Sequence, residues 1–530
     1  MENCNDKFEP IENESPALYA DRLGLIYTSK VHPNHKKENG QFFTSVKIAR
    51  FMASLSHNFK QKLKILDPGC GVGVLTCSLV EHLINNSTKT NHIEIVAYEI
   101  DIDLIPFTTR VLSYLKKWAN QNKVSLDYIL VHSDFIIDNE LLFTGKQNGK
   151  SHTNFNFDII ISNPPYFKLP KEDKRAIIAK DVTNGHPNIY SIFMAAGIKL
   201  LKENGEFIFI TPRSFSSGNY FKTFREFFFN LTRVDNIHLF TSRKESFERD
   251  SVLQEIIVLK GEKSSSIDKN NIVTITSSHG SEDLDNPKIK AYNYKEIIDL
   301  NSREKILHTP ISDFEENIFN LFKSWNGRLQ DYGLNISTGP VVAHRAIEYI
   351  KFSNEENLAP LFWLHNVDKM KLNWPIEKLN KGQYIEVNSR SLPILIQNKD
   401  YIFLRRFSSK DDKSRLIAAP YFKSSQKNKL IGVENKLNYL YRKNGFLEKE
   451  EIFGLCALLN SDLFDSYFRT FNGNVNVSAT ELREMPFPNL EEIKEIGKNI
   501  ILLSNFTSIS INEYINNFFG INHFFLNEKN

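Results

Sequence analysis

Short apolar runs recur along the first half of the chain, separated by stretches in which apolar residues follow a helical spacing. The runs are rich in Ile, Val, Leu or Phe and lie at 64–66, 93–98, 128–132, 157–162, 206–211, 237–240 and 255–260. Helical patterns lie between them, for example at 75–83, 103–118 and 189–201. Strands buried on both faces read as continuous apolar runs. The pattern therefore predicts an α/β domain with a mostly parallel sheet that helices cover on both faces.

The pattern changes after residue 260. Stretches 261–270 and 277–286 are polar and rich in turn-forming residues, which is typical of connections. The residues that follow mix short strand and helix patterns without the earlier rhythm, and they are numerous enough to form a separate core. We therefore predict an α/β domain over 1–262, a connecting segment over 263–309 and a mixed α+β domain over 310–530.

Composition excludes several classes of protein. Among 530 residues, 41% are apolar and 24% are charged, which is ordinary globular usage. Lys and Arg exceed Asp and Glu by only three, so any basic surface for a polyanion must be local. The four scattered cysteines form no metal-binding or paired spacing. With no long apolar stretch and a polar N-terminus, we expect a cytoplasmic protein without membrane span or signal peptide.

A glycine-rich turn directly follows the first predicted strand. Asp67, Gly69, Gly71 and Gly73 lie between that strand and the helical stretch at 75–83. Glycines at this point let the backbone turn sharply and approach a ligand closely, and the helix that follows offers free N–H groups. Many strand–helix turns carry glycines only for packing, so the turn alone does not establish a nucleoside site.

Two further strand ends carry carboxylates. Glu99, followed by Ile100, closes the second predicted strand, and Asp134 with Phe135 follows the third. A carboxylate at the end of the second strand can accept hydrogen bonds from both ribose hydroxyls. Asp134 is placed to accept a hydrogen bond from an adenine amino group, with Phe135 against the ring. Taken singly, Glu99 is more often a solvated strand-end charge, and Asp134 is more often a helix N-cap or a turn residue.

The fourth predicted strand ends in a rigid turn, Asn163-Pro164-Pro165-Tyr166. Two prolines fix the φ angles and remove two N–H donors, while their carbonyls still accept. The turn can thus aim the Asn163 side chain and the Pro164 carbonyl at one amino group, and Tyr166 offers a flat face for a base. The alternative is a rigid turn that only leads into a loop.

Together these motifs resemble the gamma class of adenine-N6 DNA methyltransferases, the TaqI-like and PstI/BsuBI-like modification enzymes of type II restriction-modification systems. As in that class, a Gly-Gln-Phe-Phe-Thr segment at 40–44 precedes the glycine turn, and a large C-terminal region follows the diproline turn. Ser45 stands where the class often has proline. The resemblance implies a Rossmann-like, S-adenosylmethionine-dependent methyltransferase sheet. It assigns cofactor contacts to Gln41, Phe43, Thr44, Asp67, Gly69, Gly71, Glu99, Ile100, Asp134, Phe135 and Asn163.

The resemblance also implies how a target base is held. Phe247, just before the last predicted strand, resembles the class aromatic that stacks on a flipped adenine opposite Tyr166. Segments 338–342 and 472–480 resemble recurring parts of the C-terminal recognition domain. On this basis the candidates for DNA contact are Tyr166, Phe247, Arg345, Arg405, Arg406, Asn472 and Asn474.

The implied reaction is direct methyl transfer to the adenine N6 nitrogen, with Asn163, Pro164, Pro165 and Tyr166 as the catalytic turn. The target atom lies inside a duplex, so the base must first be flipped out. We expect no metal, no covalent intermediate and no fused nuclease. The expected partners are double-stranded DNA and a cognate restriction endonuclease that is functionally paired but not bound, and the chain is expected to act as a monomer.

DNA binding also requires a local basic surface. The window 401–443 carries eleven Lys or Arg residues against three Asp or Glu, with seven aromatic residues interleaved. This composition is consistent with a face that contacts phosphates. A solvated, lysine-rich surface of a domain with another role is the alternative.

Three other functions remain open from the sequence. A methyltransferase acting on protein glutamine or RNA bases would also use such a turn, although the segment at 40–44 and the large C-terminal region favour DNA. A nicotinamide dehydrogenase fits the glycine spacing poorly and gives the diproline turn no role. A non-catalytic DNA-binding relative is disfavoured because every candidate catalytic residue is present.

Overall fold

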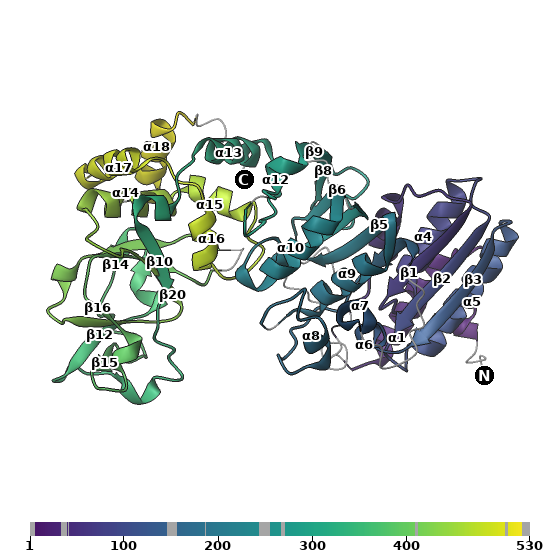
Figure 1. Ribbon diagram of the computed structural model, residues 1–530, viewed down its shortest axis with the longest axis horizontal. Coiled ribbons are helices and arrows are strands. Elements are labelled where there is room, and N and C mark those ends of the chain that lie inside the picture. Colours follow the sequence, from purple (N-terminus) through teal and green to yellow (C-terminus); the bar gives the residue numbers. More distant parts are fainter. Residues whose placement is uncertain are drawn as a thin grey trace. The chain divides into compact units, whose positions relative to one another are not determined.

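The chain folds into two compact units, Met1–Ile311 and Ser312–Asn530 (Figure 1). This computed structural model describes residues 6–32, 40, 42–145, 156–185, 187–242, 255–264, 266, 271–300, 302–408, 412–503 and 507–521. The boundary between the units lies within two residues of the predicted start of the second domain. Within the described ranges, no helix combines the length and apolar character needed to cross a lipid bilayer.

One mixed sheet forms the centre of the first unit. Among the described residues it has nine strands in the order β3-β2-β1-β4-β5-β7-β6-β8-β9. Neighbours from β3 to β5 are parallel, and β7 runs antiparallel to both β5 and β6. The strands are β1 (Lys62–Pro68), β2 (His92–Glu99), β3 (Ser125–His132), β4 (Phe157–Ser162), β5 (Leu201–Pro212), β6 (Thr232–Phe240), β7 (Ile256–Lys263), β8 (Ile272–Ser278) and β9 (Lys288–Asn293).

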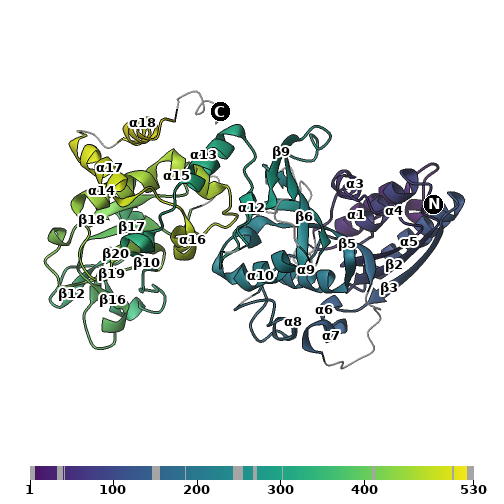
Figure 2. The same ribbon diagram turned by 45° about the horizontal axis from the view of Figure 1, so that its top comes forward.

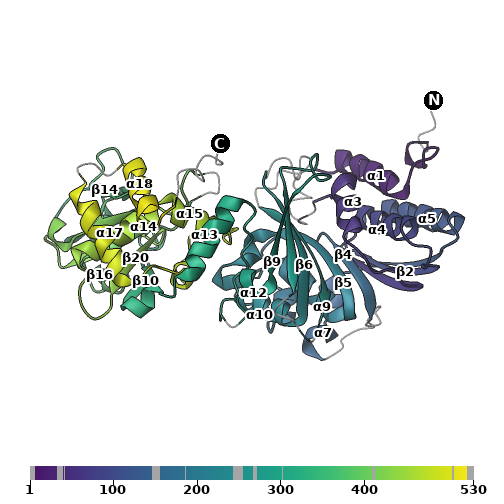
Figure 3. The same ribbon diagram turned by 90° about the horizontal axis from the view of Figure 1, so that it is seen from above.

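Helices cover both faces of this sheet, as the alternating pattern predicts (Figure 3). One layer contains α1 (Pro16–Lys30), α3 (Val46–Ser54), α4 (Val74–Asn85) and α5 (Ile105–Gln121). The other contains α6 (Phe135–Asp138), α7 (Leu141–Thr144), α8 (Lys174–Ile178), α9 (Ile189–Leu200) and α10 (Lys222–Leu231). Since β1 lies between β2 and β4, the strand order reverses there, and crevices that bind ligands open at the carboxyl ends of strands at such a point.

The predicted connecting segment 263–309 is wrong. Its described residues include β8, β9 and the short helix α12 (Tyr294–Ile297), and the two strands extend the same sheet at one edge (Figure 2). In β8, buried residues alternate with more exposed ones. A strand with one solvated face reads as an alternating, partly polar pattern, and for that reason it carries no continuous apolar run.

The second unit is a mixed α+β fold. Its described residues form a four-stranded sheet in the order β10-β20-β17-β18 and a five-stranded sheet in the order β11-β15-β12-β19-β16. The strands of the first sheet are β10 (Leu334–Thr338), β17 (Tyr401–Arg405), β18 (Ala418–Tyr421) and β20 (Leu437–Arg442). Those of the second are β11 (Ile350–Lys351), β12 (Leu358–Phe362), β15 (Tyr384–Glu386), β16 (Leu395–Gln397) and β19 (Leu430–Val433).

Helices complete this unit. They are α13 (Asp313–Ser324), α14 (Lys449–Asn460), α15 (Asp462–Arg469), α16 (Ala479–Glu484), α17 (Leu490–Leu502) and α18 (Ser508–Phe518). Several begin with a capping side chain: Ser312, Ser461, Ser478 and Asn489 each accept a hydrogen bond from the first turn, which stabilises a helix start.

Candidate active site

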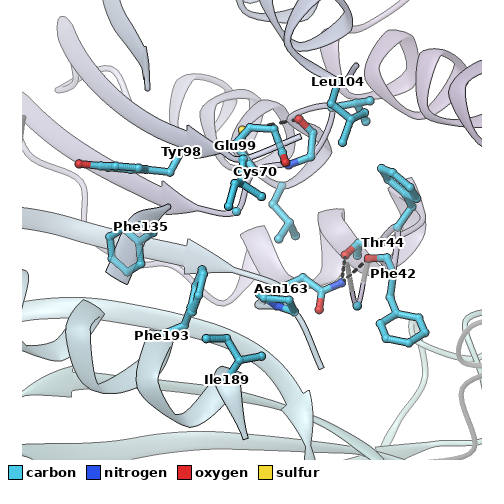
Figure 4. A pocket seen from close by; sticks show the side chains of 18 of the residues that line it. Phe42, Thr44, Cys70, Tyr98, Glu99, Leu104, Phe135, Asn163, Ile189 and Phe193 are labelled. Atoms are coloured by element: carbon cyan, nitrogen blue, oxygen red, sulfur yellow. Dashed lines mark hydrogen bonds between the residues drawn. The ribbon is translucent and has the colours of Figure 1, made fainter. Parts of the chain in front are cut away.

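A cavity of about 270 Å³ opens at the carboxyl ends of the central strands in the first unit (Figure 4). It brings together the glycine turn after β1, the end of β2, the residues after β3 and the turn after β4. The predicted residues that line it are Phe43, Thr44, Gly69, Gly71, Glu99, Ile100, Asp134, Phe135, Asn163 and Pro165. Motifs spread over more than a hundred positions meet because parallel strands end at the same edge of the sheet.

The glycine turn forms the floor between β1 and α4. Gly69, Gly71 and Gly73 all have positive φ, at 78°, 56° and 90°, a region that other residues rarely adopt. The backbone N–H groups of Gly69 and Cys70 donate to the Tyr98 carbonyl at 2.9 and 2.8 Å. The turn is thus tied to the end of β2.

Glu99 lies where a ribose-binding carboxylate is expected. Its Oε2 accepts from the Gly71 N–H at 2.9 Å and its Oε1 accepts from the Asp101 N–H at 2.8 Å. Burial raises the pKa of this carboxyl above its ordinary value, while the backbone donors oppose the shift. Each carboxylate oxygen has a second lone pair, so the carboxylate can still accept from the two hydroxyls of a ribose.

The residues after β3 form an aromatic wall with one acidic group. Asp134 caps α6, since its Oδ1 accepts from the N–H groups of Ile136 and Ile137 at 2.9 and 3.0 Å, and it also lines the cavity. The helix N-cap interpretation of Asp134 is therefore confirmed, and the contact with an adenine amino group stays a prediction. Phe135 lies 5.2 Å from Phe193 of α9, centroid to centroid, and such rings suit a flat purine.

S-adenosylmethionine, the cofactor that the resemblance implies, fits this donor set. Its nucleoside half finds a strand-end carboxylate in Glu99, an acidic group in Asp134 and flat apolar walls in Phe135 and Phe193. Gly71 places no side chain in this part of the cavity. A Cβ there would reach the Phe43 ring, which lies 3.4 Å away, and would fill the space between them.

The prediction that Asp67 contacts the cofactor is corrected. The side chain is fully buried and does not line the cavity. Its Oδ2 instead accepts from the Thr76 hydroxyl at 2.6 Å, which ties β1 to α4. Burial raises the pKa of this carboxyl from 3.8 to about 7. Asp67 therefore supports the glycine turn from behind.

Replacing Asp67 should remove a pH dependence of stability. Because the folded-state pKa of Asp67 is raised, the folded chain keeps this proton at pH values at which the unfolded chain has lost it. The free energy of unfolding therefore falls as pH rises from about 3.8 toward about 7. Asp67→Asn keeps an acceptor for Thr76 but does not ionise. We expect its melting temperature, relative to wild type, to rise by a few degrees between pH 5 and pH 8.

Asp127→Asn is the control for that measurement. Asp127 is exposed on β3, and its pKa is lowered by the hydrogen bond from Lys116. The Asp127 carboxyl is ionised in both the folded and the unfolded chain over this range. The difference in melting temperature between Asp127→Asn and wild type should therefore stay constant with pH. If the difference in melting temperature for Asp67→Asn is constant as well, the pKa of the buried Asp67 carboxyl is not raised as proposed.

The turn after β4 holds Asn163 at the cavity. The Asn163 Nδ2 donates to the Phe42 carbonyl at 2.8 Å and to the Thr44 hydroxyl at 3.0 Å (Figure 4). On its other side, the Asn163 Oδ1 accepts from the Tyr166 hydroxyl. The predicted orientation toward the glycine-lined crevice agrees with this geometry, because Asn163 and Pro165 both line the cavity with Gly69 and Gly71.

The predicted open face of Tyr166 is wrong for this conformation. Tyr166 is buried, and the ring of Phe42 stacks on it with centroids 5.2 Å apart and planes 24° apart. Its hydroxyl also reaches the Ile210 carbonyl at 2.9 Å. Neither Tyr166 nor the buried Pro164 lines the cavity. A base that stacks on this face must therefore displace the Phe42 ring.

Gly40 permits the close approach of this segment to the turn. Its φ is +59°, and a Cβ there would lie 2.7 Å from Cδ1 of Phe167 and 3.0 Å from the Tyr166 backbone nitrogen. Farther along, Ser45, the departure from the class proline, is the N-cap of α3 and accepts from the Ile48 N–H. Two features thus hold residues 42–44 against Asn163: the close contact at Gly40, which only glycine permits, and the helix cap at Ser45.

Gly40→Ala should lower methyl transfer by about 10- to 100-fold, because a small displacement of groups around a reacting centre is costly. Gly145→Ala is the matched control: its φ is +66°, and no described atom would lie within 4 Å of a Cβ there. Turnover under saturating substrates measures both variants. Equal losses would show that backbone strain, and not the approach to the turn, causes the defect.

Candidate DNA contacts in the second unit are partly corrected. Asn472 is buried and structural, since its Oδ1 accepts from Arg415 at 2.8 Å and its Nδ2 donates to Glu481 at 2.9 Å. The Asn474 carbonyl accepts from the same Arg415. These bonds stabilise the 472–480 segment in its own unit, so Asn472 has no free group for a base.

The arginines differ among themselves. Arg405 donates to the Val367 carbonyl at 2.6 Å and to Asp368 at 2.8 Å. Arg406 donates to the Asn435 carbonyl at 3.0 Å. Arg345, by contrast, is exposed, and it is more accessible than the other described candidates for DNA contact.

The basic window 401–443 is not the uniform face that its composition suggests. Tyr401, Phe403 and Tyr421 lie in the core of the unit, and Arg415 is buried. Most residues of β17 and β18 are buried, and so are three of the six in β20, so sequence proximity does not give a shared surface. Among the described residues of the window, the exposed cations are Lys413, Lys423, Lys427, Lys429, Lys436 and Lys443.

Two predicted residues, Gln41 and Phe247, lie outside the described residues. Sequence reasoning missed others: Phe193 and Ile189 of α9 and Arg175 line the cavity. Arg175 lies 3.5 Å from Asp134. The available signal was α9 itself, an almost wholly apolar helix. Its first residue is held beside the diproline turn, because the Ile189 N–H donates to the Phe167 carbonyl at 2.9 Å.

Comparison with known proteins agrees with this geometry. Residues 44–247 match the family model of the Eco57I restriction-modification methylase. The type II methyltransferase M.PstI of Providencia stuartii is 32% identical over 94% of this chain and 96% of its own length. The type II methyltransferase M.BsuBI of Bacillus subtilis is 33% identical over 88% of this chain and 91% of its own.

A solved structure supports the fold over both units. A nuclease-deletion mutant of the type ISP restriction-modification enzyme LlaGI, solved with a DNA substrate mimic, matches 90% of this chain with a TM-score of 0.52 at 12% identity. The match covers 48% of the LlaGI chain, so it bears on the fold alone. The identity to M.PstI and M.BsuBI over nearly the whole length is the stronger finding, and the chain belongs to their family, the type II methyltransferases of restriction-modification systems.

Proposed function

We propose that the protein transfers a methyl group from S-adenosylmethionine to the exocyclic N6 nitrogen of adenine in double-stranded DNA at a specific sequence. One observation carries the proposal: Asn163, held by three hydrogen bonds at the end of β4, lines the same cavity as the glycine turn and Glu99. An acceptor for an amino group is thus beside a nucleoside-binding crevice.

The chemistry requires acceptors because the N6 lone pair is delocalised into the purine ring. Hydrogen bonds from both amino protons, to the Asn163 Oδ1 and the Pro164 carbonyl, favour a pyramidal nitrogen and stabilise the charge that develops on it. The nitrogen–methyl bond forms as the sulfonium–methyl bond breaks, and the surplus amino proton leaves to solvent. The remaining contribution of the chain is alignment of the two reactants.

The extruded adenine reaches the amino-binding acceptors by replacing the Phe42 ring on Tyr166. The Phe42–Tyr166 stack has the geometry of a base on an aromatic side chain. Base–aromatic stacking contributes roughly 1–3 kcal/mol, which offsets part of the few kcal/mol needed to flip a base.

The second unit would supply target recognition, and its exposed lysines would contact phosphates. We expect reversal of Lys423, Lys427 and Lys429 to Glu to weaken DNA binding by roughly tenfold or more and to flatten its dependence on salt, by about 0.9 in log–log slope for each lost contact. Fluorescence anisotropy from 50 to 300 mM salt measures both quantities.

Lys498→Glu, an exposed lysine on α17, is the control for charge alone. An unchanged slope in the triple variant would place the phosphate contacts elsewhere on the chain.

In this proposal the chain acts as a monomer and protects sites that a separate, cognate endonuclease cleaves, without cutting DNA itself. The second candidate, methylation of RNA bases or protein glutamine, uses the same amino-binding acceptors. Radiolabelled methyl transfer to duplex DNA, RNA and protein extracts separates the two. Incorporation into duplex DNA supports the proposal, and incorporation only into RNA or protein would contradict it.

A further inference from the structure

The amide orientation of Asn163 is fixed from its nitrogen side. Its Nδ2 lies 2.8 Å from the Phe42 carbonyl oxygen. A carbonyl only accepts hydrogen bonds, so the amide atom facing it must be the NH₂ group. The Thr44 hydroxyl, at 3.0 Å, accepts from the same nitrogen. Both groups belong to one short segment that also lines the cavity (Figure 4).

The oxygen side of the amide has one variable donor. The Tyr166 hydroxyl contacts both the Asn163 Oδ1 and the Ile210 carbonyl. Burial raises the pKa of this hydroxyl well above its ordinary value, so it keeps its single proton and donates to one acceptor at a time. An incoming amino group can therefore replace it on Asn163 while the hydroxyl donates to Ile210.

Orientation matters because the two ends of an amide are nearly equal in size but opposite in hydrogen bonding. Rotated by half a turn, Asn163 would direct its NH₂ group at the substrate amine, and its oxygen would oppose the Phe42 carbonyl. Only the observed orientation gives an acceptor for the amine. Nothing in Asn163 itself selects it. The Phe42 carbonyl, which only accepts, excludes the rotated form, and the Thr44 hydroxyl adds a second acceptor beside the nitrogen.

We propose that Thr44 and the Phe42 backbone carbonyl are positioning groups for methyl transfer, which orient the Asn163 amide so that its oxygen accepts from the target amine. The inference rests on the proposed function and adds a second role to this segment: besides covering the cofactor cavity, it sets the acceptor. Thr44 is suited to this role because it is buried, lines the cavity and contacts the Asn163 nitrogen through its hydroxyl at 3.0 Å.

The test compares Thr44→Val, which removes the hydroxyl but keeps the shape, with Thr44→Ser, which keeps the hydroxyl. We expect the single-turnover rate with saturating DNA and S-adenosylmethionine to fall about tenfold in Thr44→Val and to stay within about twofold of wild type in Thr44→Ser. Cofactor and DNA dissociation constants should change less than about threefold in both.

The outcomes separate positioning from binding. A Thr44→Val variant that weakens cofactor binding but transfers at the wild-type rate once saturated would overturn the inference, as would an equal loss in Thr44→Ser. Thr183→Val removes another buried threonine hydroxyl, which bonds the Ala179 carbonyl, and should leave the rate unchanged. If Thr44→Val does not fold, Thr44→Ala gives the same comparison without the added methyl group.

Asn163→Ala distinguishes failure of this inference from failure of the proposed function. Full activity in Asn163→Ala would remove the proposed function together with the inference. A severe loss in Asn163→Ala with a wild-type rate in Thr44→Val would leave the proposed function intact and overturn only the positioning role.

Discussion

Asn163→Ala is expected to lower turnover by roughly 10²- to 10³-fold, the usual cost of removing one group that stabilises developing charge. The variant loses the acceptor for the amine, and the Phe42 carbonyl and the Thr44 hydroxyl lose their common donor. Binding of S-adenosylmethionine should weaken only a few fold, because the groups assigned to the nucleoside belong to β2, the residues after β3 and α9.

Single-turnover methylation and isothermal titration with the cofactor measure the two effects separately. Asn58→Ala is the matched control, since Asn58 is a buried asparagine of the same unit that donates to the Asp158 carbonyl at the amino end of β4. It should transfer methyl groups at the wild-type rate. Activity in Asn163→Ala equal to that of the control would remove Asn163 from the reaction.

Glu99→Ala is expected to weaken S-adenosylmethionine binding by roughly 10- to 100-fold, the range for hydrogen bonds to a charged acceptor. The substitution removes the carboxylate assigned to the ribose hydroxyls and leaves the Gly71 N–H without its acceptor. Transfer at saturating cofactor should remain within a few fold of wild type, since Glu99 is assigned to the ribose and not to the target amine.

Glu94→Ala provides the control on the same strand, because Glu94 is exposed on β2 and away from the cavity. It should bind the cofactor as wild type does. An unchanged dissociation constant in Glu99→Ala would contradict the ribose assignment and would indicate that Glu99 serves only to stabilise the glycine turn.

The first unit was largely predictable because its strands are buried on both faces. All seven predicted runs are strands, from β1 to β7, and the three predicted helices between them are α4, α5 and α9. β8 and β9 escaped prediction because β8 alternates buried with more exposed residues and β9 has a single buried residue. A pattern search for continuous apolar runs cannot distinguish such strands from a polar connection.

The site was predictable where function depends on strand ends. The glycine turn, Glu99 and Asn163 converge because parallel strands end together. The stacking of Phe42 on Tyr166 was not predictable, since it depends on how a residue 124 positions earlier in the chain packs. In the second unit, the count of charges and aromatics in 401–443 placed Arg415 and Tyr421 on the same predicted surface as the lysines. Both side chains are buried, because a count of residue types does not show which side chains face the core.

The most direct test of the central claim is the chemical identity of the methylated product. DNA incubated with the protein and deuteromethyl S-adenosylmethionine is digested to nucleosides and analysed by mass spectrometry, with Asn163→Ala in parallel. The account predicts label only in N6-methyladenine, and almost none with Asn163→Ala. Label on cytosine, or undiminished N6-methyladenine from the variant, would contradict it.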